Sequence, residues 1–427
     1  LSLLVLIHEL GHFTFAKIFK TRVEKFYLFF NPWFSLFKIK KGETTYGLGW
    51  LPIGGYVKIA GMIDESMDTE QMKKPAESWE FRSKPAYQRF LIMFGGVLFN
   101  FIFALLVYIF SLYSWGEEYL SVKDAKYGIY CDSLALSTGL KHGDIITKVG
   151  NEKVEKFSDV LLNILTTSNN TIEIKRNDSI KIIRFSESDK QKIIANGTNQ
   201  IFVTPFIPFF IDSVLPASPA QQAKLSKGDR IVGINGVETP SFYDFSKVIK
   251  TLKNKTVELK YIRDNQINHT QISINKEGMI GVSVTGPDKI FNFTKIEYSF
   301  LSSIPAGISK GISTLGDYIK QMKLLFTPEG AKQVGGFASI GSLFPTFWDW
   351  QIFWNMSAFL SVMLAFMNVL PIPALDGGHI MFVLYEIVTR RKPSQVFLEK
   401  AQLIGMALLF TLIIYANGND LFRYLFN

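Results

Sequence analysis

The sequence is poor in cysteine, and several long segments contain no charged residue. Cys131 is the single cysteine among 427 residues, so an intramolecular disulfide is excluded and the fold must be stable without one. One cysteine assigns the chain to neither an oxidising nor a reducing compartment. The net charge is +9, yet the basic residues are not gathered into one patch interleaved with aromatic residues, which nucleic-acid binding would favour. We therefore expect basic loops beside membrane spans and no nucleic-acid partner.

The charge-free segments predict membrane-spanning helices. Phe90 to Gly116 contains no charged side chain, and as a helix it could reach about 40 Å, enough to cross a bilayer. Similar runs extend from Trp350 to Leu375 and from Ala401 to Asn419. With the apolar N-terminal segment, we expect four transmembrane helices, at residues 1–19, 87–116, 350–389 and 398–419. Only seven residues precede His8, so we expect the natural chain to begin upstream, and no cleavable signal peptide is recognisable.

Residues 20–86 form a basic loop region. Twelve Lys or Arg residues occur between Lys20 and Arg89, so this region should lie outside the hydrocarbon, on the cytoplasmic side. Residues at about 44–60 alternate large and small side chains around Pro52 and a Gly pair, which predicts a hairpin or β-loop. It could be an ordinary surface hairpin, or an edge strand that pairs with an extended substrate backbone.

The polar middle of the chain carries an internal repeat. Gly143-Asp144-Ile145-Ile146 is followed 85 residues later by Gly228-Asp229-Arg230-Ile231. The pattern of a short helix, Gly-Asp, a strand and a tight turn resembles a PDZ domain, and the spacing predicts one domain per copy, at 117–200 and 201–288. Whether their grooves bind peptide or the modules act as rigid gates stays open. Residues 289–349 are then expected to form amphipathic helices at the membrane surface and a Gly-rich turn.

The first apolar segment contains the motif His8-Glu9-Leu10-Gly11-His12. Two histidines four residues apart lie on one face of a helix and can bind a single metal ion, with the adjacent glutamate as general base. This HExxH arrangement is typical of zinc proteases. Glu9 is the only charged residue between Leu1 and Lys17, so the helix belongs in a protein core or a bilayer.

Two histidines leave a catalytic zinc one protein ligand short. Glu24 is one candidate, but it follows three basic residues, where the helix should have left the membrane. Asp376 is the better candidate, because an ionisable residue at the end of an apolar span is costly and indicates function. Pro371 and Pro373 precede it and should interrupt the helix, which can bend the carboxylate towards a neighbouring helix.

These motifs in this order resemble the site-2 proteases, the zinc intramembrane proteases, and most closely their bacterial regulator of sigma-E protease branch, which carries tandem PDZ domains. The resemblance covers nearly the whole chain and implies a multi-pass α-helical membrane protein. Its four transmembrane helices would form the protease core, with two inserted α+β, β-rich PDZ domains and a membrane re-entrant β-loop.

The resemblance also assigns roles to residues. His8, His12 and Asp376 would ligate one Zn²⁺ per chain, and Glu9 would activate water for attack on the scissile carbonyl. Asn368 would bind substrate backbone or the developing oxyanion, although a hydrogen bond to a neighbouring span is an open alternative. His379 is expected to support packing or orient a ligand. The remaining expected substrate-binding residues come from the proline motif and the β-loop: Pro371, Pro373, Gly54, Gly55, Tyr56, Val57 and Lys58.

The expected function is zinc-dependent cleavage within transmembrane segments of single-span proteins, such as anti-sigma factors or remnant signal peptides, after trimming by another protease. The expected location is the bacterial inner membrane, with the PDZ domains on the periplasmic side and the active site in the cytoplasmic half of the bilayer. Two alternatives remain open from the residues. The protein could be a membrane-anchored zinc protease that acts on water-exposed misfolded chains, or a non-enzymatic membrane scaffold that binds through its PDZ domains.

Overall fold

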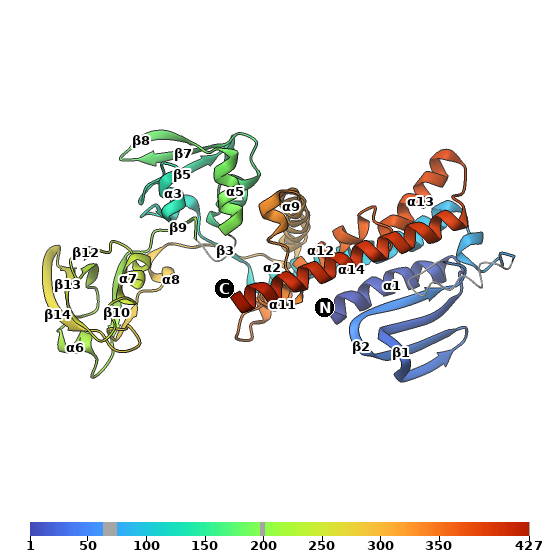
Figure 1. Ribbon diagram of the computed structural model, residues 1–427, viewed down its shortest axis with the longest axis horizontal. Helices are drawn as coiled ribbons and strands as arrows, with labels where there is room; N and C mark the ends of the chain where they lie inside the picture. Colours follow the sequence, from blue (N-terminus) through green and yellow to red (C-terminus); the bar gives the residue numbers. More distant parts are fainter. Residues whose placement is uncertain (63–74, 197–200, 427) are drawn as a thin grey trace. The chain divides into compact units, whose positions relative to one another are not determined.

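A computed structural model of the chain describes residues 1–62, 75–196 and 201–426 (Figure 1). Parts of the predicted loop region and of the first predicted PDZ domain, at 63–74 and 197–200, lie outside these described residues. The chain divides into two compact units. The first comprises Leu1–Gly116, Glu297–Met322 and Val334–Asn427, and the second comprises Glu117–Ile296 and Lys323–Gln333. Each unit is described separately below.

The first unit consists mainly of helices. They are α1 (Ser2–Ile18), the 3-10 turn η2 (Phe81–Ser83), α2 (Ala86–Trp115), most of α9 (Phe300–Leu325), α11 (Phe337–Gly341), α12 (Trp350–Val369), α13 (Asp376–Thr389) and α14 (Gln395–Phe426). In the described part of the chain, α2, α12 and α14 are long and apolar enough to cross a membrane. These three helices identify the chain as a membrane protein. The 17 residues of α1 are fewer than a span needs, so the count of four stays a prediction.

Small residues let the helices of this unit approach closely. α2 packs against α1, α12 and α13. A Cβ atom at Gly95 of α2 would lie only 2.7 Å from the backbone oxygen of Gly11 in α1, so the two backbones touch there. α9 crosses α2 through a second small-residue stripe, because a Cβ at Gly307 would lie 2.6 Å from the backbone nitrogen of Ile109. Within lipid the hydrophobic effect does not drive helices together. Helices associate there through stripes of small residues, which allow the backbones to pack closely.

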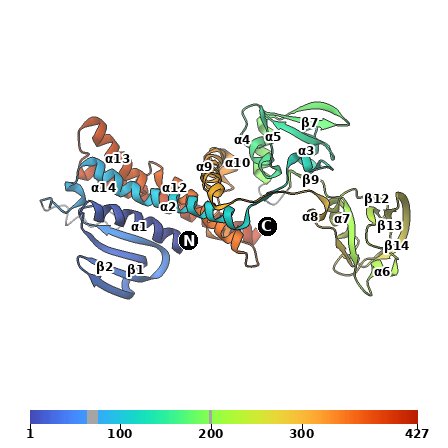
Figure 2. The ribbon, with the colours of Figure 1, turned by 180° about the vertical axis from the view of Figure 1, so that it is seen from behind.

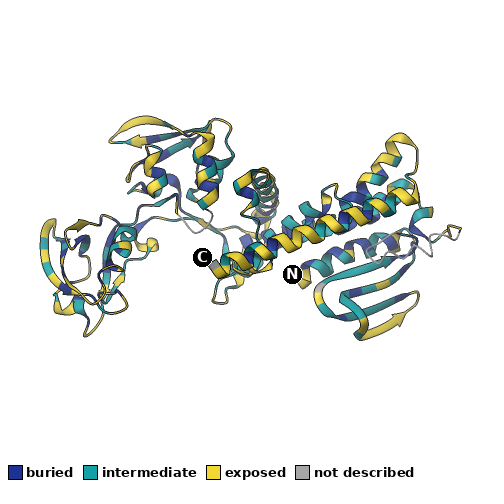
Figure 3. Ribbon diagram, in the orientation of Figure 1, coloured by how far each residue is buried: buried dark blue, intermediate teal, exposed yellow. Residues whose placement is uncertain are grey.

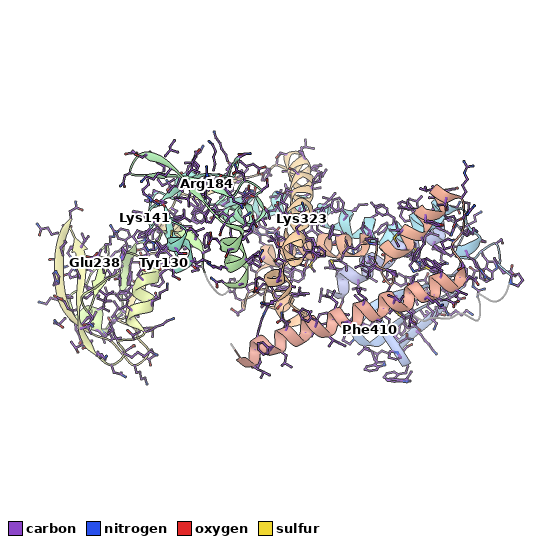
Figure 4. The ribbon with its side chains drawn as sticks, turned by 45° about the horizontal axis from the view of Figure 1, so that its top comes forward. Tyr130, Lys141, Arg184, Glu238, Lys323 and Phe410 are labelled. Atoms are coloured by element: carbon purple, nitrogen blue, oxygen red, sulfur yellow. The ribbon has the colours of Figure 1, made fainter. Side chains whose placement is uncertain are left out.

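Much of α14 is exposed (Figure 3), and many of its exposed residues are apolar. Phe410, labelled in Figure 4, is 62% exposed, and Ile404 and Ile414 are more exposed still. A long helix with this much exposed apolar surface would be unfavourable in water. It is favourable in contact with lipid, in agreement with its length and composition.

A β-sheet packs beside α1, as both ribbon views show (Figures 1 and 2). It consists of β1 (Val23–Lys41) and β2 (Thr44–Ile59), which bend so that each strand contributes two segments. Residues 23–28 pair with 55–59 on one side and with 45–48 on the other. Within the described part of the chain, Gly55–Ile59 therefore has register partners on one side only and forms an edge of the sheet. The predicted β-loop is thus β2, and β1 had not been predicted.

The second unit contains two modules whose elements follow the same order. The first consists of β4 (Ile129–Cys131), α3 (Ser133–Ser137), β5 (Ile145–Val149), β6 (Glu152–Lys153), η4 (Phe157–Asp159), α4 (Val160–Thr166), β7 (Thr171–Arg176), β8 (Ser179–Arg184), α5 (Glu187–Asn196) and β9 (Val203–Pro205). The second consists of β10 (Phe209–Val214), α6 (Pro219–Gln222), β11 (Arg230–Ile234), β12 (Val237–Glu238), α7 (Phe242–Ile249), β13 (Thr256–Arg263), β14 (Gln266–Ser273) and β15 (Val282–Val284). Flanking elements are β3 (Glu117–Tyr119), η3 (Val122–Asp124), α8 (Pro287–Ile290), β16 (Thr294–Ile296) and α10 (Pro328–Ala331).

Each module has its own sheet and core. The strand order is β6-β5-β7-β8 in the first module and β14-β13-β11-β10-β15 in the second. The repeated Gly-Asp has the same role in both copies. Asp144 and Asp229 are each buried to 1% exposure, and each accepts two hydrogen bonds from one arginine, Arg176 or Arg263, at 2.6–2.7 Å. A buried carboxylate needs such a partner, which explains why the aspartate occurs in both copies.

Candidate metal centre and active site

The two motif histidines share one face of α1, as their spacing predicts. The Nε2 atoms of His8 and His12 lie 3.2 Å apart, and both residues are buried. The Nδ1 atom of His12 lies 2.8 Å from the backbone oxygen of Ile92 in α2. Because a carbonyl oxygen can only accept, Nδ1 carries the proton and Nε2 is left to bind a metal.

Gly96 of α2 makes room for both imidazole rings. A Cβ atom there would lie 2.4 Å from Nε2 of His12 and 2.7 Å from Cε1 of His8. Real Cβ contacts essentially never fall below 3.0 Å. The site thus requires glycine at this position of the facing helix.

Asp376 reaches the histidines through a break between two helices. α12 ends at Val369, Pro371 and Pro373 follow, and α13 begins at Asp376. Ala374 has a φ of 81°, a left-handed conformation that is unfavourable for a residue with a Cβ atom. The break turns the chain so that Asp376 stands in the first turn of α13, where the helix dipole favours a negative charge.

The three predicted ligands converge on one point. Oδ2 of Asp376 lies 3.1 Å from Nε2 of His8 and 3.2 Å from Nε2 of His12. Among the described residues, these three form the group of His, Cys, Asp and Glu side chains whose donor atoms are close enough to share an ion. Glu24, the other candidate ligand, instead pairs with Lys58, with 3.7 Å between its Oε2 and the lysine Nζ.

The donor set fits a zinc ion. Ligand atoms at about 2.1 Å from a tetrahedral zinc stand about 3.4 Å apart, close to the separations of these three donors. Oδ2 of Asp376 is buried and makes no hydrogen bond with the described residues. A buried acceptor without a donor is costly, and a bound cation would remove that cost.

Glu9 faces the edge segment of the β-sheet. It lies beside the backbone of Val57 in β2, and a Cβ at Gly55 would come 3.7 Å from Cγ of Glu9. Glu9, the metal ligands and the edge residues Gly55 to Ile59 line one cavity of about 530 Å³. The general base and an edge of the β-sheet therefore open into the same space.

The other predicted substrate-binding residues lie at different places around this cavity. Nδ2 of Asn368 is 3.4 Å from Nε2 of His8, so its amide reaches the centre of the site. Tyr56 stacks on Tyr27 and donates a hydrogen bond of 2.8 Å to Asn31. Gly54 lies against the ring of Phe30. The two prolines of the break shape the chain before Asp376, and His379 also lines the cavity.

Several residues of the site were not predicted from the sequence. Gly95, Gly96 and Asn100 of α2 lie against the histidines or their helix, and Gln402 of α14 accepts a hydrogen bond from the backbone of Ala374 at 3.2 Å. The Gly-Gly pair within a charge-free segment could have predicted close contact with another helix. Nothing in the local sequence marks Asn100 or Gln402, because their partners are distant in the chain.

A family model described as peptidase family M50 matches residues 1–412 of the chain. A protein of Borreliella burgdorferi named "Putative zinc metalloprotease" is 30% identical over 92% of this chain and 89% of its own length. The regulator of sigma E protease of Haemophilus influenzae is 27% identical over 99% of this chain and 97% of its own length. Among solved structures, a PDZ domain of an SdrC-like protein from Listeria monocytogenes is 25% identical and covers 19% of this chain and 92% of its own, with a TM-score of 0.18.

The motif, the converging donors and these relatives define a membrane-embedded zinc metalloprotease. The chain belongs to peptidase family M50. The resemblance to site-2 proteases seen in the sequence is thereby confirmed, as is the prediction of an enzyme.

Proposed function

We propose that this protein is a zinc-dependent intramembrane endopeptidase that cleaves the transmembrane segments of single-span membrane proteins. The observation that carries the proposal is the meeting of His8, His12 and Asp376 beside Glu9, in a cavity bounded by apolar helices and one strand edge. In this proposal the three ligands hold one zinc ion per chain. The site takes extended peptide rather than a small molecule, because an edge strand is one of its walls.

The residues of the site have separate tasks. When bound, zinc lowers the pKa of water to about 7 and polarises a carbonyl group. Glu9 takes the proton of the attacking water and delivers it to the leaving nitrogen. The amide of Asn368 donates to the substrate backbone or the developing oxyanion. Pro371 and Pro373 hold the break that brings Asp376 into place.

The edge segment would solve a problem posed by the substrate. A transmembrane helix keeps its peptide bonds within its own hydrogen bonds, so it must unwind before attack. Gly55 to Ile59, which among the described residues has strand partners on one side only, lies at the sheet edge next to Glu9. A substrate segment that pairs with this edge would replace the lost helical hydrogen bonds and lie extended across the metal centre.

We propose further that the β1–β2 sheet enters the membrane from the cytoplasmic side. Its bend exposes a cluster of apolar side chains, with Trp33 91% exposed; the cluster comprises Trp33, Phe34, Leu36, Phe37 and Ile39. Exposed aromatic clusters are typical of membrane interfaces. A nitroxide attached at Leu36→Cys should be shielded from a water-soluble relaxation agent. Full exposure to that agent in proteoliposomes would contradict the re-entrant position.

The central experiment compares Glu9→Gln with Glu277→Gln in purified protein and a single-span substrate. We expect Glu9→Gln to keep one zinc per chain but to lose cleavage, because only the base is removed. Glu277→Gln makes the same chemical change at an exposed position of the second unit and should cleave as the parent does. Mass spectrometry of the products should place the cut within the apolar segment. Undiminished cleavage by Glu9→Gln, or cuts only in water-exposed loops, would refute the proposal.

The zinc ligands are tested separately by metal content. His8→Ala and Asp376→Ala should lose the zinc that the parent retains after dialysis, because two remaining donors hold the ion weakly. A parent without zinc, or variants that keep one equivalent, would show that the metal site is misassigned.

We propose that the active site lies in the cytoplasmic half of the bacterial inner membrane and that the PDZ-like modules are periplasmic. The support is the distribution of basic residues between Lys20 and Arg89 and at Arg390 to Lys392. Cys131 is buried to 1% exposure and should not react with a maleimide. Labelling of an introduced cysteine therefore shows on which side of the membrane that position lies. An impermeant maleimide applied to intact cells with a permeable outer layer should label Lys181→Cys and leave Arg391→Cys unlabelled. The reverse pattern would refute this orientation.

The same orientation gives the PDZ-like modules a role as a filter for substrates that another protease has already trimmed. A substrate that carries a folded periplasmic domain should be cleaved more slowly by the full-length protein than the same span with a short outer end. Equal rates for the two substrates would contradict the filter.

A further inference from the structure

Asn100 lies on α2 in direct contact with the first metal-site histidine. Its Nδ2 atom is 3.3 Å from Nδ1 of His8, on the side of the ring away from Asp376. The side chain is fully buried, and its Oδ1 atom has no hydrogen-bond partner among the described residues.

The metal geometry fixes the tautomer of His8. Its Nε2 atom points at the shared donor point with Asp376 and His12, so Nε2 must offer a lone pair to bind an ion. In a neutral imidazole the proton then sits on Nδ1, which becomes a donor. A donor at Nδ1 cannot pair with the NH₂ group of an amide, because both groups carry hydrogen.

We propose that Asn100 is a positioning residue that accepts the Nδ1 proton of His8 through its side-chain oxygen. The two ends of an amide have nearly the same shape, so a half-turn about Cβ–Cγ exchanges Oδ1 and Nδ2 without moving other atoms. After this turn Oδ1 faces Nδ1 of His8, and Nδ2 takes the place where Oδ1 had no hydrogen-bond partner among the described residues. The tautomer of His8 decides between the two orientations, and metal binding requires the one in which Asn100 accepts.

The two histidines would then be oriented in the same way. His12 donates its Nδ1 proton to the backbone oxygen of Ile92, and His8 donates to Asn100, both on α2. Each partner fixes the ring rotation and makes Nε2 a better ligand. α2 would therefore supply no zinc ligand and still set the orientation of both. The backbone oxygen of Asn100, which does not face His8, accepts a hydrogen bond of 2.8 Å from Ser361 of α12.

This inference rests on the proposed zinc-protease function, and it is tested by zinc affinity rather than by activity alone. Four proteins are compared in detergent by competition with a chelator of known affinity: the parent, Asn100→Leu, Asn100→Asp and Ser361→Ala. Asn100→Leu removes the acceptor at similar volume, and we expect a 10- to 100-fold loss of zinc affinity. Asn100→Asp keeps oxygen acceptors and cannot donate when ionised, so we expect affinity within about threefold of the parent.

Ser361→Ala is the matched control, because it removes a buried hydrogen bond to Asn100 without changing the group that faces His8. We expect unchanged zinc affinity. The visible absorption of the Co²⁺-substituted proteins gives a second readout. It should change in band position for Asn100→Leu and remain parent-like for Ser361→Ala, even if both lose thermal stability.

The outcomes distinguish a failure of the proposed zinc-protease function from a failure of the proposed role of Asn100. A parent that binds no zinc would refute the proposed function. A parent that binds zinc while Asn100→Leu binds it equally well would refute only the role of Asn100. Loss in Asn100→Asp as large as in Asn100→Leu would show that Asn100 donates instead of accepting. An equal loss in Ser361→Ala would show that the effect is merely one of helix packing.

Discussion

Replacing Gly96 by alanine should disable the metal site by adding a single methyl group. The new Cβ would lie 2.4 Å from Nε2 of His12, whereas ordinary van der Waals contacts are 3.4–4 Å. A contact of 3.0 Å, the shortest that real Cβ atoms show, requires a movement of at least 0.6 Å (3.0 minus 2.4) by the ring or the helix, and an ordinary contact of 3.4 Å requires 1.0 Å (3.4 minus 2.4). Zinc–ligand distances tolerate only about 0.2 Å. We therefore expect Gly96→Ala to lower zinc affinity by at least about 100-fold, the size of effect that a displacement of about 1 Å has on catalytic geometry.

The assay measures zinc per chain after dialysis against a graded chelator series, together with the cleavage rate and the thermal unfolding midpoint. Gly316→Ala in α9 is the matched control, because a Cβ there would meet no atom within 4 Å. It should retain zinc and activity and should gain slightly in helix stability. Overpacking in Gly96→Ala should also cost about 1–3 kcal/mol of stability. If Gly96→Ala kept full zinc content and activity, the close approach of α2 to the ligands would be refuted.

Three further predictions concern other parts of the chain. Asp229→Ala should lower the free energy of unfolding of its module by about 3 kcal/mol in urea denaturation, because Arg263 loses its buried partner but keeps some exposure to water; an effect below about 1 kcal/mol would contradict this. Ala374→Gly should raise the thermal unfolding midpoint by relieving a φ of 81°, and Ala374→Val should lower it; equal midpoints would refute strain in the break. Burial, helped by Asp144 and Asp132, raises the pKa of the Cys131 thiol from 9.0 to about 12. Below about pH 9 its contribution to stability is complete, and it is lost as pH rises from about 9 to 12, because the unfolded chain then releases the proton first. Maleimide labelling at pH 8 should therefore be slow until urea unfolds the module, and rapid labelling of the folded protein would refute the burial.

Those parts of the site that depend on local spacing could be predicted from the sequence. The four-residue separation of His8 and His12 determines their common face on any helix, and the cost of a lone carboxylate in an apolar segment marked Asp376. The distance between these residues in the chain was no obstacle, since both sit near the ends of apolar runs. The structure brings them to within 3.2 Å.

Features that depend on long-range contact could not be predicted. Asn100 looks like any polar residue of an apolar helix until α1 is placed beside it. β1 escaped prediction because Pro32 and the positive φ angles at Phe29 and Trp33 interrupt the alternation that marks a strand. The fold of the two modules was more accessible, because the repeated Gly-Asp and the turn residues are local signals and each recurs with the same spacing.

The sheet edge at Gly55 to Ile59 bears on how this enzyme would choose its substrates. A strand edge recognises N–H and C=O groups, which every residue except proline presents alike. Selection would then depend on how much free energy a given span loses when a few residues leave the helical state. Glycine lowers helix stability by about 1 kcal/mol relative to alanine and proline by about 3 kcal/mol, so two glycines near the scissile bond could change the reactive population by a factor of about 30, and a glycine with a proline by a factor of about 700. The preferred cleavage site would be the stretch of the span with the lowest helix stability, and the enzyme would not need to recognise particular side chains there.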